Sequence, residues 1–172
     1  VGDVVVLLGE NKGELGGSEY LKVVHGLVAG RPPELDLELE KRVQDLCLEA
    51  IRAGLLSSAH DCSEGGLAVT LAESCILGGL GADIALDHHG LTPAQLLYGE
   101  SHSRIVVSLA PEHLDSLEEL AKKFNVPLTV IGKVQEGNLQ VRLKVQVGEC
   151  DDQLVIVLSV EELEAAWRGA IP

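Results

Sequence analysis

The stretch HDCSEGGLAV at residues 60–69 joins a short extended segment to an apolar run with helical spacing. A helix that begins here presents unpaired backbone N–H groups and a partial positive charge, which suit a phosphate or a carboxylate. Gly65 and Gly66 let the backbone approach a ligand closely, and the carboxylate of Asp61 suits Mg²⁺. A structural alternative is open, in which Ser63 caps the helix, the glycines pack on a sheet and the other polar residues face water.

Apolar periodicity on both sides of this stretch predicts a series of strands and helices. Extended segments are expected at residues 4–8, 55–60, 82–86, 103–109, 128–132, 139–145 and 154–158. Helices are expected from Ser18 to about Val28, from Asp36 to Gly54, at 64–77, from Thr92, from Pro111 and around 163–167. Ser18 and Asp36 are typical N-cap residues, and in the first helix Leu21, Val24, Leu27 and Val28 form one apolar stripe.

Strands alternate with helices early in the chain and follow one another late, which is typical of an α+β (mixed α/β) fold. We expect a single mixed sheet with helices packed mainly on one face. Residues 1–172 are expected to form one domain, since a chain of this length buries about 70% of its unfolded surface. The strand at 4–8 begins with almost no lead-in, so we expect a domain cut from a longer polypeptide.

The charge of the chain excludes two classes of partner. Lys and Arg number 13 against 27 Asp and Glu, a formal net charge of −14. Such an acidic domain repels nucleic acid and anionic membrane. No apolar run reaches the ~18 residues of a membrane span, and no signal peptide is recognisable, so a cytoplasmic location is expected. Local backbone amides or a bound cation can still accommodate a phosphorylated ligand.

Cysteine and histidine do not occur at spacings that indicate a thiol or metal centre. The four cysteines show no CxxC pair, so we expect reduced and mostly buried thiols. The histidines outside the stretch at 60–69 and the segment at 98–104 are expected on surface turns or helix faces. These residues are Cys47, Cys62, Cys75, Cys150, His25, His88, His89 and His113.

Two other segments have polar or glycine-rich composition next to a predicted element. GELGGSEY at 13–20 places glycines before a helix, without the spacing of a phosphate-binding loop, so a structural turn is expected. YGESHSR at 98–104 groups Glu100, Ser101 and His102 with an arginine at the opening of a strand. This group either faces a ligand crevice or forms a solvated loop.

Three segments in this order resemble the synthetase subunit of phosphoribosylformylglycinamidine synthase, an amidotransferase of purine biosynthesis. They are LGE…GELGGSEYLK, HDCSEGGLAVTLAES and LLYGESHSRIVVSL. The resemblance covers essentially the whole chain and is to the C-terminal domain of the second repeat of that subunit. The glycine pair is shared with a superfamily that includes aminoimidazole ribonucleotide synthetase, selenophosphate synthetase and thiamine-monophosphate kinase. GGSEYL and GESHSR are what point to the amidine synthase.

The resemblance implies an ATP-dependent carbon–nitrogen ligase that converts formylglycinamide ribonucleotide, glutamine and ATP into the amidine, glutamate, ADP and phosphate. It implies Mg²⁺ at Asp61, and a ribonucleotide or phosphate site at Glu100, Ser101, His102, Gly65 and Gly66. In this family the ATP loop and the catalytic histidine lie on the preceding domain. We therefore expect no catalytic residue in this chain, and no activity from the chain alone.

The implied partners are the preceding nucleotide-binding domain, the first repeat of the same enzyme, a glutaminase and a small accessory subunit. The chain departs from the first repeat of the family in one triplet, because it has Glu-Ser-His at 100–102 where that repeat has Glu-Ser-Gln. The crevice is therefore either a working site, or a pseudo-site that holds a structural nucleotide or nothing.

Three alternatives compete with this reading. In the first, the chain is the same domain of another superfamily member. In the second, it is a metal phosphohydrolase that uses His60 and Asp61 as ligands. In the third, it is a non-catalytic module that packs on the other parts of an enzyme. The strand signals count against the phosphohydrolase, whose ligands are generally carried by a helical bundle.

Overall fold

The structure is a computed structural model that describes residues 1–87, 90–144 and 153–169. Within these residues seven strands form one sheet. They are β1 (Val4–Leu8), β2 (Ser58–Asp61), β3 (Gly81–Asp87), β4 (Ile105–Leu109), β5 (Leu128–Gln135), β6 (Asn138–Lys144) and β7 (Gln153–Ser159). The order across the sheet is β2-β4-β1-β5-β3-β6-β7. β3 and β6 are parallel and the other described neighbours are antiparallel, so the sheet is mixed.

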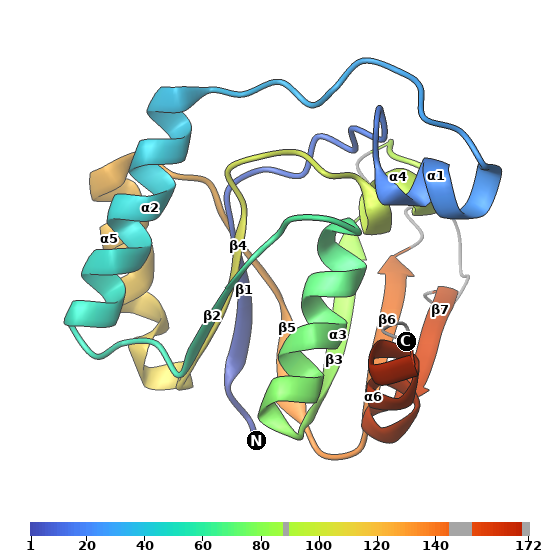
Figure 1. The fold of residues 1–172 in the computed structure, drawn as a ribbon. Helices are drawn as coiled ribbons and strands as arrows, with labels where there is room; N and C mark the ends of the chain where they lie inside the picture. The colour runs from blue at the N-terminus through green and yellow to red at the C-terminus, as the bar shows by residue number, and fades with distance from the viewer. Residues whose placement is uncertain (88–89, 145–152, 170–172) are drawn as a thin grey trace.

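Six α-helices are described alongside this sheet (Figure 1). They are α1 (Glu19–His25), α2 (Leu37–Arg52), α3 (Gly66–Gly78), α4 (Pro93–Tyr98), α5 (Leu114–Phe124) and α6 (Val160–Gly169). A 3₁₀ turn at Pro111–His113 precedes α5. Figure 1 shows α2 and α5 together at one side, and α3 and α6 in front of the strands.

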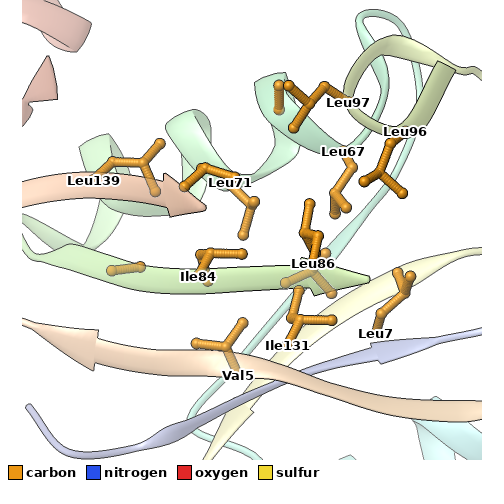
Figure 2. Packing of buried hydrophobic residues seen from close by; sticks show 14 of the residues in the cluster. Val5, Leu7, Leu67, Leu71, Ile84, Leu86, Leu96, Leu97, Ile131 and Leu139 are labelled. Atoms are coloured by element: carbon orange, nitrogen blue, oxygen red, sulfur yellow. The ribbon is translucent and has the colours of Figure 1, made fainter. Parts of the chain in front are cut away.

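One hydrophobic cluster lies between the sheet and helices α3, α4 and α6. Leu67 and Leu71 of α3 point toward Ile84 and Leu86 of β3 (Figure 2). Leu163 of α6 belongs to the same cluster. The side chains are almost all aliphatic, as the 2% aromatic content requires.

A second cluster lies on the opposite face, under α2 and α5. Val6 and Leu8 of β1 join Leu46 of α2 in this cluster, whereas Val5 and Leu7 belong to the first one. Successive residues of a strand point to opposite faces, so β1 contributes to both. The predicted α+β fold with a single mixed sheet is confirmed, but its helices cover both faces and not mainly one. The reason is the apolar run of β1, since a strand buried on both faces needs a layer on each.

Several predicted boundaries shift for local reasons. Asp36 caps α2 as predicted, because its Oδ1 accepts from the amides of Glu38 and Leu39 at 3.0 Å each. β4 begins at Ile105 and not at residue 103, because Ser103 has a left-handed φ of 60°. Pro111 starts the 3₁₀ turn and α5 follows it.

Helix α1 differs more from its prediction. It ends at His25, because Gly26 adopts a left-handed φ of 65°. The predicted apolar stripe is not buried: α1 has no buried residue, and Val24 and Leu27 are exposed. The helix lies beside α4, where Tyr20 stacks on Tyr98 with ring centroids 5.1 Å apart (Figure 1).

The described cysteines behave as predicted. Cys47, Cys62 and Cys75 are buried and free. Burial raises the pKa of each thiol, and that of Cys75 to about 11, so the thiols stay protonated at neutral pH. Cys150, His88 and His89 lie outside the described residues. Among the helices of the described segments, none has the length and apolar character that crossing a bilayer requires.

The two-faced core predicts a large difference between neighbouring leucines of α2. Leu46 is fully buried and Leu48 is exposed. We expect Leu46→Ala to lower the free energy of unfolding by about 2–5 kcal/mol, because it leaves a cavity under α2. Leu48→Ala is the control, with a change within about 0.5 kcal/mol. Urea unfolding followed by circular dichroism measures both, and equal losses would contradict the packing.

Candidate functional site

The stretch at 60–69 forms the end of β2, a tight turn and the start of α3. Gly65 and Gly66 both adopt left-handed φ angles, 81° and 64°. A Cβ on Gly66 would lie 2.5 Å from the carbonyl oxygen of Gly99, so this glycine lets α3 begin directly against the segment that carries Glu100. The alternative in which Ser63 caps the helix is wrong: Gly65 is the N-cap, and it provides no side chain to accept a hydrogen bond.

The carboxylate of Glu100 takes over the capping of this helix start. Its Oε1 accepts a hydrogen bond from the backbone N–H of Gly65 at 2.8 Å. The same oxygen accepts from the backbone N–H of Glu19, the first residue of α1, at 2.9 Å. Negative charge at a helix N-terminus is favourable, so one carboxylate stabilises the starts of two helices.

Arg104 lies behind this carboxylate and is 2% exposed. Its Nε donates to the carbonyl oxygen of Ser101 at 2.8 Å, and its Nη2 to that of Gly99 at 2.7 Å. The two bonds fix the turn that presents Glu100. Burial lowers the pKa of the guanidinium, and the charges of Glu14 and Glu100 act in the opposite direction. Within the described residues the buried Nη1 has no hydrogen-bond partner.

A cavity of about 690 Å³ adjoins these groups. It lies between the first half of α2, the turn before α3 and the segment at 100–105. Its lining residues are Leu35, Leu37, Glu40, Val43, Gln44, Asp61, Cys62, Ser63, Glu64, Glu100, His102, Ser103, Arg104 and Ile105. The Oγ of Ser103 donates to Glu40 Oε2 at 2.7 Å across this space, which ties the segment to α2.

The structure brings some of the predicted site residues together and separates others. Asp61, Glu100 and His102 line the same cavity. Ser101 is 1% exposed, and its Oγ accepts from the backbone N–H of Glu14 at 3.4 Å. Gly65 and Gly66 are buried behind the lining, so these two glycines and Ser101 shape the site from outside the cavity.

Asp61 is exposed at the edge of the cavity. Its backbone carbonyl accepts from Thr70 Oγ1 at 3.2 Å, and within the described residues its carboxylate has no hydrogen-bond or ion-pair partner. No group of three or more His, Cys, Asp or Glu residues with metal-binding geometry occurs in the described part of the chain. A Mg²⁺ ion at Asp61 would therefore take its other ligands from phosphate oxygens and water, which is its usual preference.

His60 does not form a metal-binding pair with the Asp61 carboxylate. Its Nδ1 lies 2.9 Å from the carbonyl oxygen of Asp61, and its Nε2 lies 3.5 Å from Glu73 Oε2. Both ring nitrogens thus face protein oxygens. This geometry gives no support to the phosphohydrolase alternative.

The glycine-rich segment at 13–20 is a turn up to Ser18, the N-cap of α1, and the turn packs against the same region. The carbonyl oxygen of Glu14 accepts from the backbone N–H of Glu100 at 2.8 Å. A Cβ on Gly16 would lie 1.8 Å from the carbonyl oxygen of Arg31, so the glycine here serves backbone packing. Sequence reasoning placed Arg104 in the polar group at 98–104 but assigned it no binding role, and it did not single out Glu14. An arginine directly before a buried strand of an acidic chain was the available signal for Arg104.

The close approach at Gly66 predicts a matched pair of effects in α3. Gly66→Ala combines a left-handed φ with a backbone clash, so we expect it to lower the free energy of unfolding by about 1–3 kcal/mol. Gly78→Ala is the control, because Gly78 lies in the same helix with open space around it and an ordinary φ. There the added Cβ favours the helix by about 0.5–1 kcal/mol. Thermal unfolding measures both variants. A Gly66→Ala variant that unfolds at the wild-type temperature would contradict the described turn.

Comparison with known proteins places this geometry in a family. Residues 1–144 match the family described as AIR synthase related protein, C-terminal domain. The phosphoribosylformylglycinamidine synthase subunit PurL of Moorella thermoacetica is 49% identical over 171 residues. That match covers 99% of this chain and 22% of the relative, so the chain spans less than a quarter of the relative's length.

Solved structures show the same fold. PurL of T. maritima complexed with ATP matches with a TM-score of 0.69 and 25% identity, over 94% of this chain and 25% of that chain. PurLQS from Thermotoga maritima matches with a TM-score of 0.67 and 25% identity, over 94% of this chain and 26% of that chain. The chain therefore belongs to the AIR synthase related protein family and is a C-terminal domain of that family.

Proposed function

We propose that this chain is the C-terminal domain of the second repeat in the synthetase subunit of a phosphoribosylformylglycinamidine synthase. The whole enzyme would convert formylglycinamide ribonucleotide to the amidine with ATP and glutamine. The observation that carries the proposal is the cavity of about 690 Å³ that joins Asp61, Glu100 and His102. The 49% identity to a PurL subunit supports it.

In this proposal Asp61 provides a carboxylate on the cavity lining that is exposed and, among the described residues, unpaired. It would hold Mg²⁺, which neutralises phosphate charge during phosphoryl transfer. His102 is exposed on the same lining and can donate a hydrogen bond to an anionic ligand. We assign Glu100 a capping role in place of the predicted contact with the ribonucleotide, since its Oε1 is committed to backbone amides.

The domain would act together with parts of the enzyme that lie outside this chain. The ATP complex of T. maritima PurL supports nucleotide use by the whole subunit. We assign ATP binding and the catalytic histidine to the preceding domain, and ammonia supply to a glutaminase. The first repeat of the same enzyme and a small accessory subunit complete the proposed partners. No membrane or nucleic-acid contact belongs to the proposal, and the proposed location is the cytoplasm.

A second candidate function is a non-catalytic assembly module. Two observations favour it. The amide of Gly65, which a phosphate could bind, is already paired with Glu100. In addition, α1, the segment after it and the first residue of α2 expose apolar side chains, which suits contact with a neighbouring domain. They are Val23, Val24, Leu27, Val28, Leu35 and Leu37.

The two candidates predict different effects of Asp61→Asn in the complete synthetase with its glutaminase. If Asp61 holds Mg²⁺, the magnesium concentration for half-maximal amidine formation rises by at least about tenfold, the size expected when metal binding is weakened. Asp115→Asn is the control, because Asp115 is exposed on α5 outside the cavity. A synthetase assay at varied magnesium measures both. An unchanged magnesium dependence would reject the metal role and favour the assembly module.

The 172-residue chain alone is expected to show no magnesium-dependent ATP hydrolysis, because the proposed nucleotide loop and catalytic base lie outside it. Release of inorganic phosphate from ATP measures this. Sustained turnover by the purified chain, lost in Asp61→Asn, would overturn the assignment of ATP chemistry to the preceding domain.

A further inference from the structure

The Glu100 carboxylate occupies the place at the start of α3 where a ligand anion would bind. We propose that Glu100 is an internal anion that closes this cavity to phosphate, so that a phosphate group reaches the Gly65 amide only when the carboxylate is displaced. Because it takes phosphate as the ligand class, the inference rests on the proposed function. It makes Glu100 a regulatory residue of the cavity, whose carboxylate keeps phosphate out in the structure described above.

The first step is the geometry of the carboxylate. Its Oε1 lies 2.8 Å from the Gly65 nitrogen and 2.9 Å from the Glu19 nitrogen. A charged oxygen that accepts two amide hydrogens has the arrangement found when an anion binds at a helix start. A phosphate oxygen at the same position would need the same amides and would meet the negative charge of Glu100. The two anions therefore exclude one another.

The second step is Arg104, an independent sign that the cavity is built for negative charge. Its guanidinium is 2% exposed and lines the cavity, and its Nη1 has no hydrogen-bond partner among the described residues. Glu100 and Glu14 are the carboxylates whose charges act on it. A buried cation requires a nearby anion. When the Glu100 carboxylate moves away, a bound phosphate can neutralise the charge of Arg104 and accept a hydrogen bond from its Nη1.

The third step connects the cavity to α1. The oxygen that caps α3 also holds the first amide of α1. This helix buries no residue of its own, so the hydrogen bond to Glu100 and the stacking of Tyr20 on Tyr98 are its main described attachments. Displacement of Glu100 would leave the start of α1 with the cap from Ser18 alone, whose Oγ accepts from the backbone N–H of Leu21 at 3.4 Å. Phosphate binding and the mobility of α1 are therefore coupled in this proposal.

The test is a titration of the 172-residue chain with inorganic phosphate at constant ionic strength, followed by the ¹⁵N–¹H resonances of Gly65 and Glu19. In the wild-type chain we expect phosphate to leave both resonances in place. In Glu100→Ala we expect a saturable shift of the Gly65 resonance and a phosphate affinity at least about tenfold higher, since a charge is removed and an amide is freed. Hydrogen exchange of the α1 amides is expected to be faster in the same variant.

Glu64→Ala is the matched control. Glu64 is exposed, lines the same cavity, and has no side-chain hydrogen bond or ion pair among the described residues, so its removal deletes one negative charge without freeing an amide. We expect its phosphate affinity to stay within about twofold of the wild type, because an exposed charge is screened. An increase equal to that of Glu100→Ala would show a general charge effect and would overturn the proposal.

Glu100→Gln keeps the test decisive if Glu100→Ala does not fold. Its amide oxygen can still accept from Gly65 while the negative charge is gone, so phosphate competes at a lower electrostatic penalty. We expect a gain between those of Glu64→Ala and Glu100→Ala. A phosphate affinity of Glu100→Gln equal to that of the wild type would overturn the proposal, and so would a Gly65 shift in the wild-type chain.

Repeating the Glu100→Ala titration with Mg²⁺, and in a Glu100→Ala/Asp61→Asn double variant, separates this proposal from the proposed function. A gain in phosphate binding that is independent of both Mg²⁺ and Asp61 supports closure by Glu100 and counts against the metal role of Asp61. If the single variant shows no gain at any magnesium concentration, closure is rejected, whatever the complete synthetase shows for Asp61→Asn.

Discussion

The Glu100 carboxylate joins the starts of α1 and α3, because its Oε1 accepts the amide hydrogens of Glu19 and Gly65. The other features of the cavity depend on this junction. Gly66 has to be a glycine for α3 to reach the turn at Gly99. The buried guanidinium behind the turn holds it through two backbone carbonyls. Charge, backbone conformation and packing thus fix one another at this point of the fold.

Much of the fold could be predicted from local pattern. Apolar runs located the strands, and side-chain caps such as Asp36 located helix starts, because both signals lie within a few residues of the element they define. The placement of helices on both faces was also available in the run VVVLL at 4–8, since a strand apolar at every position is covered on both sides. The apolar stripe of α1 led to a wrong expectation of burial, because periodicity shows that a helix has an apolar face and does not show what covers that face.

The site was predictable in part. HDCSEGG indicated a helix start with close backbone contact, and both glycines have the left-handed conformation that favours this residue. The cap was not predictable from that stretch, because it comes from Glu100, which is distant in the chain. Likewise, Asp61 and Glu100 share a cavity through the pairing of β2 with β4, in which Asp61 lies opposite Ile105. The register between two strands that are distant in the chain cannot be predicted from the residue spacing within either motif.

The weak attachment of α1 has a consequence for how its sequence can vary. Val23 of α1 is 75% exposed and Val28, in the segment after the helix, is 83% exposed, so substitution of either residue removes little contact with the rest of the domain. Selection on these side chains would then come from the surface that they meet in the proposed multidomain enzyme and not from the folding of this domain. Substitutions at these exposed positions would then follow changes in the surface that contacts them. In the chain alone the same residues leave apolar surface exposed to water, and exposed apolar surface of this kind favours association between molecules.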